Sequence, residues 1–180
     1  MKALILAAAP CVFDDARRAL ACGGFDAFYV VNAAGMHWPL ADWWVTGHPE
    51  CLPRWRRERE AAGWPMPPVV SAPTPKRPTE GVDRWTDVRW PGMPDSLRVT
   101  SALLAVKAAL EDGAGRVVIC GAPLGREGGH IDPDAPQDHD YARYRHGVQW
   151  AAYHAFADRV RGTSGYPAKV LGEVTREWLR

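Results

Sequence analysis

Several common functional signatures are missing from this chain of 180 residues. No stretch approaches the ~20 consecutive apolar residues of a membrane-spanning helix, so no membrane span is predicted. The formal net charge is only +1, with 22 lysines and arginines against 21 aspartates and glutamates. No strong global field therefore attracts nucleic acid or anionic membranes.

The cysteine pattern excludes the usual cysteine-based sites. The four cysteines, Cys11, Cys22, Cys51 and Cys120, show neither a CxxC spacing nor a Cys/His metal spacing. Their scatter favours reduced thiols and a cytoplasmic location. The apolar start MKALILAAAP is short and acidic residues soon follow it, so we do not expect a secretion signal.

The two best-known nucleotide motifs are also missing. The first expected strand is not followed by G-x-G-x-x-G, and G-x-x-x-x-G-K-[ST] occurs nowhere in the chain. Neither a dinucleotide-binding fingerprint nor a Walker-type ATPase is therefore predicted.

What the sequence does contain is a clear helix–strand unit between Val99 and Leu124. Thr100 and Ser101 stand where a helix needs an N-cap, and the following alanines and leucines are strong helix formers. Gly113 occupies the position of a left-handed C-cap residue. The β-branched run 116–120 then predicts a strand that is buried on both faces.

Strands and helices alternate along the rest of the chain. Further helices are expected from Asp14 or Asp15 to Ala21, over 53–62, from Asp138 to Phe156, and as a closing turn at 175–179. Strands are expected at 2–6, 28–32, 42–46, 69–71, 116–120 and 159–163. This alternation predicts an α/β fold, a single Rossmann-like domain over 1–180 with a doubly wound, mostly parallel sheet. Strands 2–6, 28–32 and 116–120 should be adjacent and parallel.

A segment rich in proline and tryptophan, residues 64–98, interrupts this alternation. Its part from Trp64 to Ser96 holds eight of the sixteen prolines, which predicts a long excursion from the fold. Trp85 and Trp90 favour an excursion that packs against the domain. The sequence leaves open whether the segment is a covering loop or a lid over a binding site.

In such a fold the carboxyl ends of the strands and the amino end of the central helix share one edge. Small residues after the first strand let a ligand approach the backbone, and Asn32 offers both a donor and an acceptor. Thr100 and Ser101 present N–H groups and hydroxyls at a positive helix end, which suits a phosphate. His48 and His130 are each candidates for a general base.

Two further pairs of residues lie in the segments expected at or near this edge. Asp132 and Asp134 are spaced like ligands of a hard cation, but a solvated acidic loop is the favoured interpretation. Tyr141 and Tyr144 are expected in the core rather than in catalysis.

The segments LILAAAPCV, FDAFYVVNAAG and TSALLAVKAALEDGAGRVVICGAPL resemble the bacterial sialyltransferase-like and pterin-pyrophosphokinase-like Rossmann superfamily, including small proteins of tailed phages and prophages. In that family a G-x-G-P-S type turn follows the first strand, and an Asn closes the second. Here alanines replace the glycines and Pro10 is kept, while Ala122 stands where an Asp often follows Gly121. The resemblance implies that Asn32 and the Thr100–Ser101 pair contact a nucleotide and that His130 lies at a basic histidine's position.

The resemblance, together with the residues at this edge, implies a nucleotide-binding, glycosyltransferase-like enzyme that uses a nucleotide-activated donor such as a sugar nucleotide. The expected site has the nucleotide on Ala8, Pro10, Asn32 and Gly121, phosphates on Thr100 and Ser101, His130 as base and His48 in reserve. No metal ligands are predicted, although a magnesium ion is left open, as is a homo-oligomer. The alternatives are a metal-dependent pyrophosphokinase and a non-catalytic phage or prophage accessory protein that keeps the fold.

Overall fold

The computed structural model describes all residues except 74–79, 98, 126–128, 136–140, 155 and 157. Its centre is one seven-stranded sheet with the order β5-β4-β3-β2-β1-β6-β7, in which every neighbouring pair is parallel. The strands are β1 (Lys2–Leu6), β2 (Ala27–Val31), β3 (Trp43–Thr46), β4 (Val69–Ser71), β5 (Arg84–Trp85), β6 (Arg116–Cys120) and β7 (Val160–Gly162).

The predicted adjacency of the three most apolar strands is confirmed. β1 lies in the middle of the sheet and pairs with β2 on one side and β6 on the other. Leu4 and Ile5 are fully buried, because β1 is covered on both faces. The strands that directly follow β1 in sequence are added on one side of it, whereas β6 and β7 are added on its other side. The edge above β1 and β6 is therefore the topological switch point, where open α/β sheets bind ligands.

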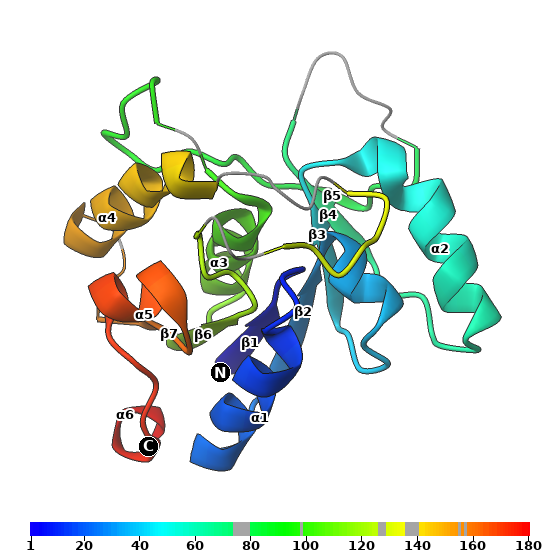
Figure 1. Cartoon of the computed structure of the whole chain (residues 1–180). Coiled ribbons are helices and arrows are strands. Elements are labelled where there is room, and N and C mark those ends of the chain that lie inside the picture. Colours follow the sequence, from blue (N-terminus) through cyan, green and yellow to red (C-terminus); the bar gives the residue numbers. More distant parts are fainter. Residues whose placement is uncertain (74–79, 98, 126–128, 136–140, 155, 157) are drawn as a thin grey trace.

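Helices cover both faces of the sheet, as a doubly wound fold requires (Figure 1). One face carries α1 (Val12–Cys22), α2 (Leu52–Ala61) and α6 (Arg176–Leu179). The other face carries α3 (Ser101–Glu111), α4 (Arg145–His154) and α5 (Gly165–Leu171).

The central helix α3 forms as its sequence predicts. The Oγ1 atom of Thr100 accepts a hydrogen bond from the amide of Leu103 at 3.2 Å, so Thr100 is the N-cap. The alanines of α3 are buried against the sheet, which lets the helix lie close to it. Gly113 follows the helix with φ 86°, a left-handed conformation that glycine adopts without strain.

Several boundaries differ from the sequence-based prediction. The helix expected from Asp138 to Phe156 begins only at Arg145, after a 3₁₀ helix (Tyr141–Tyr144), and Asp138 itself lies outside the described residues. α1 begins two residues before Asp14. α5 was not predicted, because Gly165 and Pro167 have the composition of a turn, yet a proline is tolerated in the first turn of a helix.

The insertion 64–98 contributes to the sheet as well as to its covering. β4 was predicted, whereas the two-residue strand β5 was missed. The ring of Trp90 packs 5.2 Å from the ring of Phe156, as expected of a segment that packs down, while Trp85 is 40% exposed.

The basic run from Arg54 to Arg59 in α2 does not form one exposed patch. Arg59 is fully buried and donates hydrogen bonds to the carbonyl oxygens of Gly35, Trp38 and Pro39 at 2.6–3.0 Å. Burial lowers the pKa of this guanidinium. Arg59 therefore holds the turn after β2 against α2. None of the four cysteines, all of which the structure describes, forms a disulfide. No helix of the described chain is long and apolar enough to cross a membrane.

Candidate functional site

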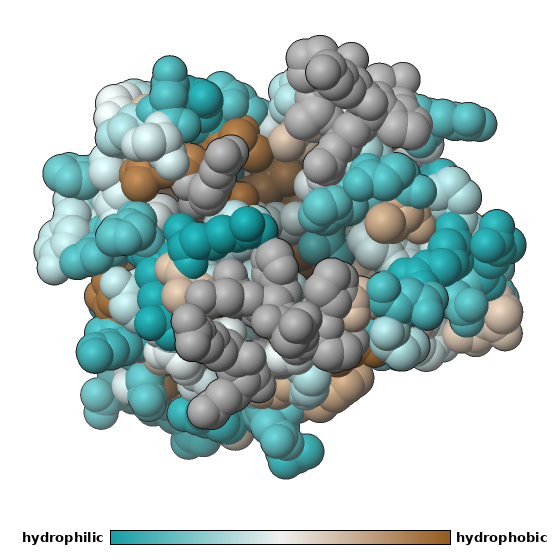
Figure 2. Space-filling view, turned by 45° about the horizontal axis from the view of Figure 1, so that its top comes forward, coloured by the Kyte–Doolittle hydropathy of each residue, from teal (hydrophilic) through white to brown (hydrophobic). Residues whose placement is uncertain are grey.

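A cavity of about 740 Å³ lies at the carboxyl edge of the sheet, above the switch point. Figure 2 looks onto this side and shows an apolar hollow bordered by hydrophilic residues. The segments that follow β1, β2, β3 and β6 form its wall together with the amino end of α3. This is the volume of a typical small-molecule site and the location expected for one in an open α/β sheet.

Most of the predicted site residues meet at this cavity. It is lined by Ala8, Asn32, His48, Thr100, Ser101, Gly121 and His130. Pro10 is exposed and is not among the described lining residues. Gly121 has φ 70°, and a Cβ atom there would lie 2.7 Å from the carbonyl oxygen of Ala7, so the turn after β6 needs glycine.

The side chain of Asn32 is oriented by the strand beside it. Its backbone has φ 50°, a left-handed conformation that Asn tolerates, which is why β2 ends one residue earlier than predicted. Its carbonyl oxygen accepts a hydrogen bond from the ring of Trp44 at 2.7 Å. Its side-chain Oδ1 accepts one from the Thr46 hydroxyl at 2.9 Å, and that hydroxyl accepts the amide of His48. Because Oδ1 of Asn32 accepts this hydrogen bond from the protein, the side-chain nitrogen of Asn32 supplies donors to the cavity.

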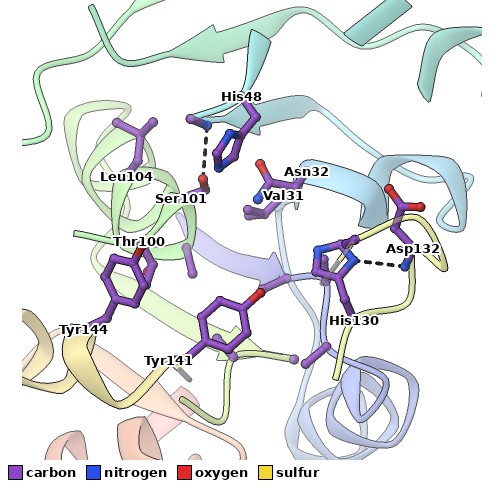
Figure 3. Close-up of a pocket in the computed structure, with 18 of the residues that line it drawn as sticks. Val31, Asn32, His48, Thr100, Ser101, Leu104, His130, Asp132, Tyr141 and Tyr144 are labelled. Atoms are coloured by element: carbon purple, nitrogen blue, oxygen red, sulfur yellow. Dashed lines mark hydrogen bonds between the residues drawn. The ribbon is translucent and has the colours of Figure 1, made fainter. Parts of the chain in front are cut away.

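The amino end of α3 is arranged in the same way. The Oγ atom of Ser101 accepts a hydrogen bond from the amide of Gly47 at 3.1 Å, so its hydroxyl hydrogen is left as a donor (Figure 3). Thr100 uses its own Oγ1 as the cap acceptor. The first amides of α3 and the positive end of the helix dipole add to this donor surface.

His130 lies on the opposite wall, between Asn32 and Tyr141 in Figure 3. Its Nδ1 atom accepts a hydrogen bond from the amide of Asp132 at 3.0 Å. Burial lowers the pKa of His130 below its ordinary value of 6.5 and outweighs the charge of Asp132 and a backbone hydrogen bond with Asp132, which both raise this pKa. Electrostatic interactions with Arg54 and His48 lower it further. The imidazole is therefore neutral at physiological pH.

The loop that carries His130 is bound to α2. Asp132 is 3% exposed and pairs with the guanidinium of Arg54, and the indole of Trp55 donates to the same carboxylate at 3.3 Å. Burial works to raise the pKa of Asp132, but the hydrogen bonds from Arg54, the Asp134 amide and Trp55 outweigh it and leave this pKa below its ordinary value. The expected solvated acidic loop is thus wrong for Asp132, because Arg54 neutralises it in a buried position.

Three residues at this cavity were missed or assigned elsewhere by the sequence. Arg54 lines it from α2, although it appeared in the sequence as one member of a basic run. Tyr141 and Tyr144 also line it, with ring centroids 6.2 Å apart, so they face the cavity as well as the core. The only signal for the tyrosines was their spacing, which fits either location.

The described residues do not form a protein-only cation site. Asp132 and Asp134, the pair with suitable spacing, both bind Arg54. No group of three or more His, Cys, Asp or Glu side chains that could hold a metal ion occurs in the described ranges. These described residues do not fit a bound magnesium ion.

Comparisons with models of known protein families, with curated protein sequences and with solved structures gave no match.

Proposed function

We propose that this protein binds a nucleotide through its phosphates and transfers a group from a nucleotide-activated donor. The observation that carries the proposal is the orientation of the polar side chains at the switch point. Asn32 and Ser101 each use an acceptor atom to bind another part of the protein. Each is thereby left with a donor, so the cavity is suited to a ligand rich in acceptor oxygens, as a diphosphate is.

The two ends of the cavity suggest how a nucleotide lies in it. The phosphates are expected at the amino end of α3, where Ser101 supplies its hydroxyl and the helix end is positive. The nucleoside is expected against the apolar and aromatic part of the lining, to which Val99, Tyr141 and Tyr144 contribute. The small side chains after β1, among them Ala8, allow the ligand to approach the backbone closely.

The test is a thermal-shift panel of nucleoside mono-, di- and triphosphates and sugar nucleotides. A ligand at a hundredfold excess over its Kd stabilises the native state by about 2.7 kcal/mol. In a chain of this size, that stabilisation raises Tm by roughly 5–11 °C. Flat melting curves at millimolar ligand throughout the panel would contradict the proposal and favour the non-catalytic alternative.

The decisive variant is Asn32→Asp, which keeps the side-chain shape and the tolerance of a positive φ but replaces donors by acceptors. Loss of hydrogen bonds to a charged ligand costs about 1.5–3 kcal/mol, so Kd should rise about 10–100-fold. Gln149→Glu is the matched control, because it adds the same charge at an exposed position of α4 outside the cavity lining. Equal ligand-induced shifts in the two variants would contradict the donor argument.

A further steric test uses Ser101→Leu, which leaves the amides of α3 in place but blocks the approach to them. The pyrophosphokinase alternative is separated by chelation. Turnover that is lost in a chelator and restored by magnesium would favour the pyrophosphokinase, whereas the transferase that we propose continues without added metal.

A further inference from the structure

We propose that the end of the cavity above β4 and β5 is a separate apolar compartment that binds the body of the second substrate. The acceptor of the transferred group is then an alcohol or phenol with an apolar body rather than a sugar. This inference rests on the proposed function, because it names the class of the acceptor. The compartment is defined by four lining side chains, those of Ala72, Pro73, Val88 and Leu104.

The compartment lies beyond the donor groups along the edge of the sheet. Ala72 directly follows β4, whereas Asn32 follows β2, two strands away. Neighbouring strands are about 4.8 Å apart, so the compartment begins about 10 Å from Asn32. In Figure 3, Leu104 lies on one side of Ser101, and Tyr141 and Tyr144 lie on the other. A nucleotide with its base at the tyrosines and its phosphates at Ser101 therefore leaves this compartment open for a second molecule.

The polar side chains that end β3 and β4 are bound inside the protein. The hydroxyl of Ser71 is fully buried and donates a hydrogen bond to the carbonyl oxygen of Thr46 at 2.8 Å. The hydroxyl of Thr46, equally buried, donates to Asn32 and accepts the amide of His48. Neither Ser71 nor Thr46 is among the described residues that line the cavity. The side chains that face a ligand from these two strand ends are therefore apolar.

The wall of the compartment is supported by the core. Leu104 is 1% exposed, and Ala72 and Val88 are partly buried against the same core cluster. A ligand with an apolar body removes the remaining surface of Ala72 and Val88 from water, which favours its binding. The four side chains of the compartment include no aromatic ring, so a nucleobase stacks better on Tyr141 and Tyr144 at the other end.

The same wall disfavours a sugar. A sugar has several hydroxyl groups that lose their hydrogen bonds to water on binding, and the four apolar side chains replace none of them. An apolar alcohol or phenol has a single hydroxyl to place. Ser101 and Leu104 are three residues apart and are neighbours on the surface of α3. A molecule whose body contacts Leu104 can therefore turn its hydroxyl towards the phosphate end of the donor.

The first test is a calorimetric titration of the full chain with 2-naphthol, a phenol with an apolar two-ring body. Methyl glucoside is the sugar for comparison. We expect 2-naphthol to bind at least about tenfold more tightly, because unpaired hydroxyls weaken the binding of the glucoside. Inorganic pyrophosphate should not displace 2-naphthol, because the two occupy different parts of the cavity. Absence of 2-naphthol binding, equal or tighter binding of the glucoside, or displacement by pyrophosphate would overturn the inference.

The location is tested by Val88→Asn, which places a polar amide in the wall. The affinity for 2-naphthol should fall by about tenfold, whereas the affinity for pyrophosphate should stay within about threefold. Val82→Asn is the matched control, because Val82 is a partly buried residue of the same insertion and is not among the described lining residues. Equal losses of 2-naphthol affinity in the two variants would overturn the location.

Ala72→Phe is a second variant that does not depend on the folding of Val88→Asn. Its ring fills the compartment from a partly buried position, so it should abolish 2-naphthol binding and leave pyrophosphate binding in place. Unchanged affinity for 2-naphthol in this variant would also overturn the location.

The two proposals fail separately. If pyrophosphate and the nucleotides do not bind the native chain, while 2-naphthol binds and Val88→Asn weakens it, the proposed function fails and the apolar compartment stands. If the nucleotides bind and 2-naphthol does not, the compartment fails and the proposed function stands.

Discussion

Replacement of Asp132 by alanine tests whether the loop that carries His130 is held by its buried ion pair. The carboxylate accepts hydrogen bonds from Arg54 and from the indole of Trp55, and its Oδ1 atom accepts the amide of Asp134 at 3.1 Å. Truncation at Asp132 removes these acceptors while it keeps the backbone amide that binds His130. The variant therefore changes the anchoring of the loop and leaves its backbone intact.

The size of the effect follows from the exposure of the two partners. Hydrogen bonds to charged groups contribute about 1.5–3 kcal/mol, and a fully buried pair costs more when one partner is removed. The side chain of Asp132 is 4% exposed, but that of Arg54 is 33% exposed, so water replaces part of what Arg54 loses. We therefore expect Asp132→Ala to lower the free energy of unfolding by about 2 kcal/mol, which lowers Tm by roughly 4–8 °C.

Asp134→Ala is the matched control, because Asp134 binds the same guanidinium from a side chain that is 74% exposed. An exposed ion pair contributes about 0–1 kcal/mol, so this variant should lower Tm by less than about 4 °C. The assay is thermal and urea unfolding of both variants beside the native chain, without ligand. Equal losses in the two variants, or no measurable loss in Asp132→Ala, would refute the argument that burial of Asp132 anchors the loop.

Two further predictions concern packing and pH. Gly35→Ala should lower the free energy of unfolding by about 3 kcal/mol in urea titrations, because the new Cβ atom would lie 2.1 Å from the ring of fully buried Trp44. Gly115→Ala is the control and should change this free energy little, because no atom lies within 4 Å of the position of its Cβ. Acid should destabilise the chain in two stages in unfolding experiments from pH 8 to pH 3. The pKa of His130 in the folded chain is below 6.5, so the unfolded chain takes up a proton first, and the free energy of unfolding falls as the pH drops through 6.5. His130→Gln should remove this stage. An unchanged pH profile in that variant would contradict the prediction. The folded pKa of Asp132 is below 3.8, so its contribution is complete above that pH and is lost below it.

The elements that the sequence predicted best are those with local and redundant signals. β1 and β6 are continuous apolar runs, and α3 has a hydroxyl N-cap, a run of helix formers and a glycine after its end. Each signal lies within the element, so no knowledge of distant contacts is needed. The same reasoning placed Thr100 and Ser101 at the edge where the strands end, and the cavity there confirms this location.

The elements that it missed depend on contacts between distant segments. β5 is only two residues long and exists because Arg84 and Trp85 pair with β4. Asp132 is buried because Arg54, 78 residues earlier, reaches it from α2. No periodicity or composition in 126–137 indicates that partner, so a solvated acidic loop was the natural expectation. Tertiary partners decide both cases, and these were not visible in the sequence.

The chemistry of the candidate site depends on the atoms that hold its side chains more than on the types of those side chains. An asparagine can turn either its oxygen or its nitrogen to a ligand, and the hydroxyl of Thr46 binds the oxygen of Asn32. A serine hydroxyl can donate or accept, and the amide of Gly47 binds the oxygen of Ser101. These partners lie 14 and 54 residues away along the chain, so neither orientation is visible in the sequence. Substitution of Thr46, which is not among the described residues that line the cavity, should therefore alter what Asn32 offers to a ligand.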